Sequence, residues 1–281
     1  MKVGVVNKVR RTIGKYRLFR KSDKILVAIS GGKDSAALLH ILKELGYDCE
    51  AIHVNLHVEN YSKRCLNAVK EICSELDVKL NVVDMEKELG IKRRVFRKAV
   101  KRKLIPSVCY ACGILRKYLL NKKARELGAS VIATGHNLDD EAETIVMNVF
   151  KGSLNLCLNL GPKTGVLTCE AFVPRVKPLY FCKNEETLAY AMANDLPFVQ
   201  KSCPDLKTSL RWMIREFLSE VNERYPNFNE KLVMNFLSLL PKIRRKWEYE
   251  GKLKRCAICG EPSHQEICKA CEILKIIKAI G

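Results

Sequence analysis

The chain has 281 residues, 47% of them hydrophobic, and a formal net charge of +19. This length suffices for one main core with small additions, and the composition is that of a folded globular protein. Metabolite binding alone does not explain so large an excess of Lys and Arg. We therefore expect a polyanionic partner, with nucleic acid favoured over a membrane surface.

No apolar stretch approaches membrane-spanning length, and the basic N-terminus lacks an apolar signal core. These features predict a cytoplasmic protein with no membrane association. The thirteen cysteines would indicate disulfides in a small secreted domain. Without a signal peptide they are better explained as metal ligands and reduced core thiols.

Residues 1–24 carry nine Lys or Arg and a single acid, with apolar side chains at near-helical spacing. The pattern predicts an amphipathic helix with a basic outer face, which we assign to residues 1–23. That face is either an ordinary solvated surface or a direct contact with nucleic acid, and the sequence leaves both open.

A glycine-rich hexad follows an apolar run at residues 25–29 and precedes a helical pattern at 36–45. Two glycines let the backbone turn tightly and approach an anion, while the start of a helix supplies N–H groups and positive potential. The longer spacing of a Walker A loop is absent. The sequence predicts a strand-loop-helix phosphate site, the alternative being a tight turn without a ligand. The hexad is Ser30-Gly31-Gly32-Lys33-Asp34-Ser35.

Further predicted strands alternate with predicted helices along the next hundred residues. Such alternation indicates parallel pairing and right-handed crossovers, hence an open α/β sheet flanked by helices. Ligands of these sheets lie beyond the carboxyl ends of the strands, so a nucleotide is expected there. His53, at one such end, is better explained as a hydrogen-bonded structural histidine. The strands are expected at residues 51–55, 80–83 and 131–134, and the helices at 63–76 and 114–127.

A basic run from Lys92 to Lys103 contains eight basic residues and no acid. A solvated face is the ordinary explanation of such a run. This one leads into the pair Cys109 and Cys112, and basic charge beside thiols favours the thiolate.

An acidic turn, residues 135–144, follows the strand at 131–134 and opens a helix whose first turn carries Asp139 and Asp140. Ordinary helix capping explains acids at this position. Two adjacent carboxylates at the ligand edge of a sheet also suit Mg²⁺ binding or proton transfer.

The following segment, residues 152–170, is rich in Gly, Asn, Leu and Pro and is predicted to be a mobile loop over the site. Cys203 precedes a proline and is predicted to lie in a turn. A helix is expected before it, at residues 185–194, and two helices after it, at 210–225 and 229–247, are expected to be scaffold.

The tail repeats a cysteine pattern, two C-x-x-C pairs separated by eight residues. Two such pairs suit one tetrahedral Zn²⁺ with four thiolates and no open position. A ribbon this small has no core of its own, so metal binding would supply much of its folding free energy. His264 lies between the pairs and is expected to be a loop residue. The predicted zinc ligands are Cys256, Cys259, Cys268 and Cys271.

Together these motifs resemble the TtcA/TtuA family of tRNA 2-thiolation enzymes, which are PP-loop ATP pyrophosphatases, and most of all its TtuA branch. The resemblance implies a PP-loop domain over residues 24–250 and a zinc ribbon over 251–281. Members of that branch usually begin with an N-terminal zinc finger, whereas here the basic helix comes first. The matching segments are SGGKDS at 30–35, CYACG at 109–113, ATGHNLDDEAET at 133–144, PRVKPLY at 174–180, KSCPD at 201–205 and the tail cysteines.

The family resemblance also implies functional residues. Cys109, Cys112 and Cys203 would hold a [4Fe-4S] cluster, and Asp140 would be the catalytic acid. Either member of the basic pair Arg116 and Lys117 would face the phosphates. The family's nucleotide contacts fall on Ala28, Ser30, Asp34, Val54, Arg116 and Gly135.

The implied reaction adenylates the C2 carbonyl of a tRNA uridine with ATP and Mg²⁺, then replaces the oxygen by sulfur. Three cysteine ligands leave one iron of a cubane without a protein ligand, which suits the delivery of hydrosulfide. The sulfur donor would be free sulfide or a ubiquitin-like thiocarboxylate, and a homodimer is expected.

Three other functions stay open from the sequence. In iron-independent thiolation, Cys109 or Cys112 would carry a persulfide that Cys203 resolves as a disulfide. An adenylating ligase or amidotransferase subunit leaves these thiols and the basic charge unexplained. In a different class, the chain would be a zinc-ribbon RNA-binding module without turnover.

Overall fold

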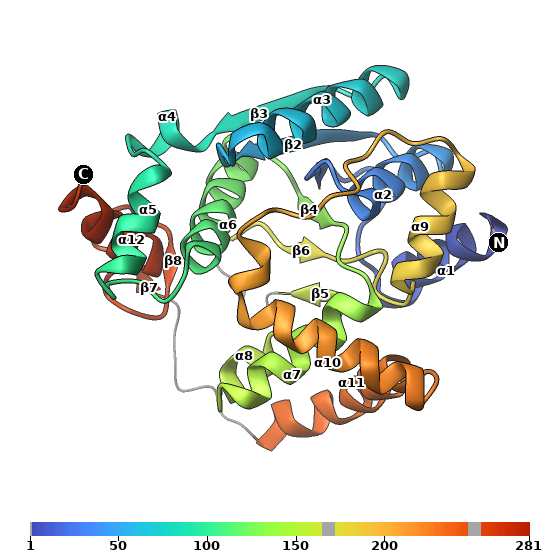
Figure 1. Cartoon of the computed structure of the whole chain (residues 1–281). Helices are drawn as coiled ribbons and strands as arrows, with labels where there is room; N and C mark the ends of the chain where they lie inside the picture. The colour runs from blue at the N-terminus through green and yellow to red at the C-terminus, as the bar shows by residue number, and fades with distance from the viewer. Residues whose placement is uncertain (1, 165–171, 247–253) are drawn as a thin grey trace.

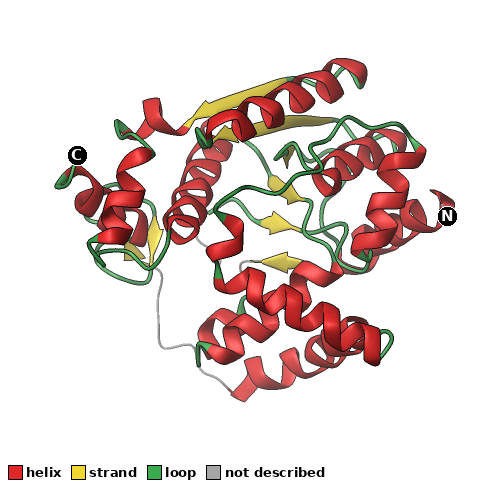
Figure 2. Cartoon of the chain, viewed as in Figure 1, coloured by secondary structure: helices red, strands yellow, loops and turns green. Residues whose placement is uncertain are grey.

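The structure, a computed structural model, describes residues 2–164, 172–246 and 254–281. A six-stranded sheet lies at its centre with helices on both faces (Figure 1, Figure 2). The strands of this sheet are β1 (Ile25–Ala28), β2 (Cys49–Asn55), β3 (Leu80–Asp84), β4 (Val131–Thr134), β5 (Lys163–Thr164) and β6 (Arg175–Val176).

The helices that follow and flank these strands fall into three packed groups. The first group is α1 (Lys2–Tyr16), α2 (Lys33–Glu44), α3 (Glu59–Glu75) and α9 (Asn184–Ala193). The second is α4 (Met85–Leu89), α5 (Arg94–Lys101), α6 (Val108–Glu126) and α12 (Lys269–Lys278). The third is α7 (Leu138–Phe150), α8 (Leu154–Leu158), α10 (Leu210–Arg224) and α11 (Phe228–Lys246), and the short 3-10 helix η1 (Leu206–Thr208) comes just before α10.

The strand order is β3-β2-β1-β4-β6-β5, and every neighbouring pair is parallel except β5 with β6. The predicted parallel α/β sheet is thus confirmed. The chain runs outward from β1 to β2 and β3 on one side, and to β4 and β6 on the other. Since ligands of open sheets bind where the strand order reverses, the edge beyond β1 and β4 is the expected site.

Alternate residues of the central strands face two different helical layers. Ile25 and Val27 of β1 pack with the first group, whereas Leu26 of β1 and Ile132 of β4 pack with the second. All four are 5% exposed or less. A strand buried on both faces explains why the sequence shows a continuous apolar run there rather than alternation.

The third helical group has its own apolar cluster, in which Leu138 and Ile145 of α7 pack with Ile214 and Leu218 of α10 and Val233 of α11. Because α7 begins directly after β4, this cluster attaches α10 and α11 beside the carboxyl end of that strand (Figure 1).

The tail forms a short hairpin, β7 (Lys254–Arg255) with β8 (Pro262–Ser263), followed by α12. Ile273 and Ile277 of α12 join the apolar cluster of α5 and α6, and Figure 1 shows the tail against those helices, away from α1. The expected boundary at residue 251 falls outside the described residues, so the division into domains stays a prediction.

Two regions differ from expectation. The segment predicted as a loop over residues 152–170 contains α8 and the edge strand β5, both too short to leave a sequence pattern, and residues 165–170 lie outside the described part. α6 begins at Val108 rather than near residue 114, because the Ser107 side chain caps it by accepting from Tyr110 N at 3.1 Å. In the described segments, no helix is both long and apolar enough to cross a membrane.

Candidate nucleotide and metal site

The phosphate loop, residues 30–35, connects β1 to α2 and requires glycine at its second position. Gly31 has φ +86°, in the left-handed region, and a Cβ there would lie 2.7 Å from Cys65 Cα on α3. Only glycine fits such a close backbone approach. The loop is therefore packed directly against α3.

Hydroxyl groups hold the loop in shape from within. Ser35 Oγ donates to the Gly32 carbonyl at 2.9 Å and accepts from Ser30 N at 3.1 Å. Gly32 is the N-cap of α2 and carries no capping side chain. The start of α2 thus faces the loop with its positive end, as a phosphate site requires.

Asp34 connects three elements through a single carboxylate oxygen. Its Oδ1 accepts from Lys33 Nζ at 2.7 Å, Thr187 Oγ1 at 2.5 Å and Asn137 Nδ2 at 3.1 Å. Its other oxygen makes no hydrogen bond within the described residues. Asp34 therefore fixes α9 and the start of α7 around the loop while keeping one oxygen for a ligand.

The other predicted nucleotide contacts lie at the ends of neighbouring strands. A Cβ on Gly135, just after β4, would lie 2.8 Å from Ser35 N, so this glycine also permits a close approach to the loop. Ala28 ends β1, and Val54 lies near the end of β2 with its side chain in the α6 layer. The fold therefore brings the phosphate loop, Ala28 and Gly135 together, and Val54 lies one strand away.

His53 has the structural role expected of it. Its side chain is 4% exposed, and its Nδ1 lies 2.9 Å from the Ile29 carbonyl, which joins β2 to β1. Burial lowers the pKa of His53. The neutral ring is therefore part of the scaffold.

The acids of the turn after β4 make structural contacts. Asp139 accepts from Asn184 N and Asn229 Nδ2, both at 2.7 Å, and so holds α9 and α11. Asp140 forms a capping box with Asn137 and lies 3.5 Å from Arg215 Nη2. Asp139 is fully used in this way, whereas the contacts of Asp140 are long, at 3.3 Å from Asn137 N and 3.5 Å from Arg215.

Cys109 and Cys112 lie in the first turns of α6, and Cys203 faces them from the segment between α9 and α10. Figure 1 shows this segment crossing in front of the sheet and reaching α6 before α10 begins. Cys109 Sγ donates to the Asp205 carbonyl at 3.3 Å. Burial first, and then Cys203 and Cys112, raise the pKa of Cys109 to about 11. The three predicted thiols are thus neighbours.

Two arginines bring positive charge to these thiols. Burial raises the pKa of Cys112, while Arg93 and then Arg116 oppose that rise. Arg93 is 5% exposed and forms an ion pair with Asp205. One residue of the basic run thus turns inward to the cysteine site, which composition alone did not indicate.

The arrangement fits a polynuclear cluster better than a single ion. In a cubane each cysteine binds a different iron, so the sulfur atoms need not converge on one point. In the described ranges, the one group of His, Cys, Asp or Glu whose ligand atoms all lie within 4.8 Å is in the tail, not here. Three neighbouring thiols beside arginines suit an anionic iron-sulfur group.

A fourth thiol near the site carries no sequence signal. Cys65 of α3 is 3% exposed, contacts Gly31 and lies close enough to Cys203 to have its pKa raised by that thiol as well as by burial. Tyr61, one turn earlier, donates to Cys65 and also lies near Arg116. Cys65 thus lies between the phosphate loop and Cys203.

The tail cysteines form a compact set. Their four sulfur atoms lie within 4.8 Å of one another. Burial opposes ionisation of Cys256, but backbone N–H donors, first that of Cys268 at 3.2 Å, lower its pKa to about 6. His264 lies in the loop before Cys268, outside this set. Four converging thiols fit a closed tetrahedral metal site.

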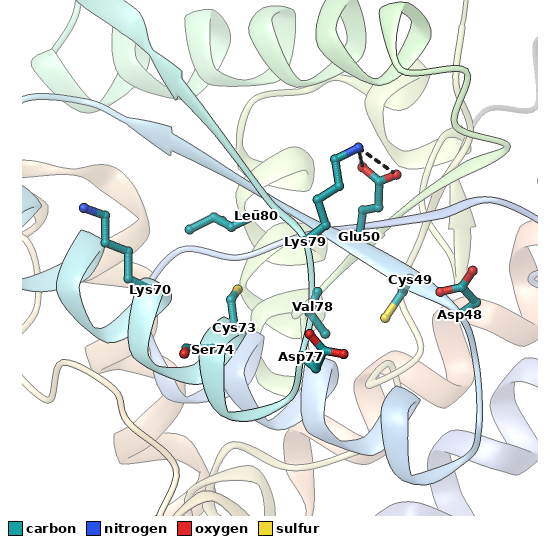
Figure 3. A pocket seen from close by; sticks show the side chains of 10 residues that line it. All are labelled: Asp48, Cys49, Glu50, Lys70, Cys73, Ser74, Asp77, Val78, Lys79 and Leu80. Carbon is teal, nitrogen blue, oxygen red and sulfur yellow. Dashed lines mark hydrogen bonds and ion pairs between the residues drawn. The ribbon is translucent and has the colours of Figure 1, made fainter.

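A cavity of about 620 Å³ lies at the opposite edge of the sheet, around the start of β2 and β3 (Figure 3). Glu50 and Lys79 in its wall form an ion pair at 3.4 Å. The cavity contains no part of the phosphate loop or of the cysteine site, and its charged groups include partners for one another. It belongs to neither site.

Residues 1–222 match the family described as the PP-loop domain. This match shows that the chain belongs to the PP-loop family, and the sheet order and the glycine loop agree with it. Its relatives include proteins named tRNA-5-methyluridine(54) 2-sulfurtransferase. That of Pyrococcus horikoshii is 34% identical over 279 residues, covering 98% of this chain and 86% of the relative. That of Thermotoga maritima is 33% identical over 277 residues, covering 98% and 88%.

A solved structure agrees with this family. The U34-tRNA thiolase NcsA from Methanococcus maripaludis, described with its [4Fe-4S] cluster, matches with a TM-score of 0.80 and 28% identity. The match covers 99% of this chain and 87% of that chain. The sequence resemblance to PP-loop tRNA 2-thiolation enzymes and the α/β fold it implied are confirmed.

Proposed function

We propose that the chain is an ATP-dependent tRNA 2-sulfurtransferase that adenylates the C2 carbonyl of a uridine and replaces its oxygen by sulfur. One observation carries the proposal. The phosphate loop and the three-thiol site are neighbours, because Cys65 contacts Gly31 on one side and lies beside Cys203 on the other. ATP activation and sulfur transfer would then occur in one place.

The first step forms the bond between uridine O2 and the α-phosphorus of ATP and breaks the bond to pyrophosphate. The phosphate loop and the start of α2 bind the departing pyrophosphate, whose negative charge they stabilise. Of the basic pair Arg116 and Lys117, Arg116 would add positive charge to the ATP phosphates. Mg²⁺ would accompany the triphosphate, with the unengaged oxygen of Asp34 as one ligand.

The uridine N3 proton must leave as the adenylate forms. Asp140 is the proposed acceptor, because both of its contacts are long and leave the carboxylate able to take a proton. In the second step hydrosulfide adds to C2, the C2–O bond breaks and AMP departs. The thiol proton of the hydrosulfide then returns to N3, which balances the reaction.

Cys109, Cys112 and Cys203 would hold a [4Fe-4S] cluster. When bound, this group supplies an iron without a protein ligand, where sulfide can be held. Arg93 and Arg116 would stabilise the negative charge of the thiolates. The four tail cysteines would hold a structural Zn²⁺. The sulfur donor, a homodimer and a cytoplasmic location stay predictions.

The decisive experiment incubates anaerobically prepared protein with tRNA, ATP and sulfide, and measures AMP and thiouridine by mass spectrometry. We expect both products, and neither without ATP. Cys203→Ala should abolish thiouridine, whereas Cys157→Ala should not, since Cys157 is a buried thiol within α8. Absence of AMP formation with every tRNA tested would leave the RNA-binding module as the better explanation.

A second candidate is iron-independent thiolation through a persulfide. Cys65 favours it, because it provides an additional thiol beside Cys203 that could resolve a persulfide as a disulfide. Full activity of iron-free protein supplied with a persulfide donor and with a thiol reductant that reopens the disulfide, lost in Cys203→Ala, would select this mechanism.

A further inference from the structure

The region beyond the carboxyl ends of β4 and β6 contains more positive than negative side chains. Of the carboxylates, Glu141 pairs with Lys177 at 2.5 Å, and Glu143 pairs with Arg211 at 3.0 Å. Arg215 forms ion pairs with Glu143 at 2.6 Å and with Asp140 at 3.5 Å. The cations there are Arg116, Lys117, Arg175, Lys177, Arg211 and Arg215, against Asp140, Glu141 and Glu143.

Three of these cations have no carboxylate within ion-pair distance anywhere in residues 2–164, 172–246 and 254–281. They are Arg116 and Lys117 on α6 and Arg175 on β6. The protein around them and their mutual repulsion lower the pKa of Lys117 to about 8 and that of Arg175 to about 10. Like charges gathered without a counterion destabilise the free protein, so this group of cations is suited to bind an anion.

Arg175 also has an unsatisfied donor. Its Nη2 donates to the Lys117 carbonyl at 3.0 Å, but its Nε is buried and has no hydrogen-bond partner among the described residues. A buried guanidinium N–H without an acceptor costs free energy. Arg116 and Lys117 remain accessible to water beside it. The missing acceptor can therefore reach this place from solvent.

The three cations Arg116, Lys117 and Arg175 lie apart from the phosphate loop. The loop follows β1, Gly135 and His136 follow β4, and Arg175 lies on β6, one strand further. His136 has its pKa lowered by burial and then by Lys177 and Arg211, so it lies at the border between the two. An anion at Arg175 would lie next to the ATP phosphates and not within the loop.

We propose that Arg175 and Lys117 bind a phosphodiester of the RNA substrate beside the nucleotide that reacts. The inference rests on the proposed function and describes how the enzyme would hold its tRNA substrate. Every target base brings a backbone phosphate with it when it leaves its stack to reach the site. A planar guanidinium with a free N–H suits two phosphate oxygens, and the neighbouring ammonium adds charge. Arg116 then lies between this phosphate and Cys112.

Binding of unmodified tRNA and of ATP, each measured at equilibrium, tests the proposal with Arg175→Gln and Lys117→Gln. Each variant should weaken tRNA binding by about tenfold and reduce the slope of log affinity against log salt by about one. ATP binding should stay within about twofold, because the loop is untouched. Lys79→Gln, an exposed cation at the opposite edge of the sheet, is the matched control and should change neither.

Thermal stability separates ligand binding from a scaffold role. Removing a repelled, uncompensated charge should raise the melting temperature of ligand-free Arg175→Gln, whereas loss of a scaffold contact would lower it. Should the strand position not tolerate glutamine, Lys117→Gln on the exposed side of α6 keeps the test valid.

Three results would overturn the inference. Unchanged tRNA affinity in both variants, with normal binding by the unaltered protein, rejects this subsite alone. Weakened ATP binding of the same size assigns the cations to the nucleotide instead. If the unaltered protein binds no tRNA, the proposed function fails and this inference with it.

Discussion

The two cysteine sites of this chain differ in how they are assembled and in what surrounds them. The tail site uses four cysteines within sixteen residues, and a hairpin and one helix bring their sulfur atoms within 4.8 Å. The central site uses three cysteines from two segments more than ninety residues apart, joined by packing of the segment before α10 on α6. A closed set stabilises structure, whereas an open one leaves room for chemistry.

Their surroundings differ as well. The tail is attached through Glu261, which accepts from Asn121 at 2.7 Å and pairs with Arg125 of α6. The central site faces Arg93, Arg116 and the phosphate loop. Positive charge is neutralised where the tail meets α6 and left in excess around the central thiols. This contrast predicts that damage to the two sites has different consequences.

The largest effect should follow from removing a central ligand. Cys203→Ala should lower thiouridine formation at least about a hundredfold, since changes in residues that merely support metal ligands already cost 10–100-fold. AMP formation with tRNA should persist within a few fold, because the phosphate loop is intact. Iron content, thiouridine and AMP are measured on the same anaerobic preparation. Equal losses of AMP and thiouridine would contradict the separation of the two steps.

The junction between loop and cysteine site should be the next most sensitive. Gly31→Ala forces a positive φ on alanine and places its Cβ 2.7 Å from Cys65 Cα, which together cost about 2–5 kcal/mol. We expect a lower melting temperature and AMP formation reduced to background. Adding Cys65→Ala should not restore either, because the closest contact is with the Cys65 backbone. Restoration by that second change would show that the side chain, and not the backbone approach, sets the requirement.

The motifs whose residues are close in sequence could be predicted, whereas residues that become neighbours only in the folded chain could not. The loop at 30–35, the pair Cys109 and Cys112 and the tail pairs are recognisable because their chemistry depends on spacing along the chain. Cys65 and Arg175 are not, because one occupies an ordinary core position of a helix and the other a two-residue strand. Their roles follow from neighbours that are distant in sequence.

One scaffold helix also has contacts that its sequence pattern does not reveal. α10 was expected to be scaffold, and its apolar side does pack with α7 and α11. Its other side carries Arg211 and Arg215 to the acids after β4. The helical period predicts which side is buried in the core, but not that the polar side meets a second element.

Loss of the tail metal should have a smaller effect, confined to stability. The Cys256→Ser, Cys259→Ser double variant should bind no zinc, and its tail amides should lose protection in hydrogen exchange, because metal binding supplies much of the folding free energy of such ribbons. Each kcal/mol lost should lower the melting temperature by about 2–4 °C. AMP formation at 25 °C should stay within a few fold. Unchanged zinc content would reject the site, and complete loss of AMP formation would show that the tail supports the catalytic edge.

The smallest predicted effect concerns the excess charge at the central site and depends on pH. The surrounding protein, followed by Arg175 and Arg116, lowers the pKa of Lys117 from 10.5 to about 8. Between about pH 8 and 10.5 the unfolded chain therefore holds more protons at this position than the folded one, so stability attributable to Lys117 rises with pH. Below pH 8 Lys117 is charged in both states, and its repulsion by neighbours destabilises the folded chain.

Lys117→Gln removes this repulsion, so it should melt at a higher temperature than the unaltered protein at pH 7. The difference should shrink as pH rises from about 8 to 10, where Lys117 loses its proton in the folded state. Since Lys117 is an exposed residue of α6, added salt should reduce the difference at pH 7. Lys79→Gln is the control and should show no such trend. A difference independent of pH would mean that packing, and not unneutralised charge, distinguishes this side of the central site from the tail.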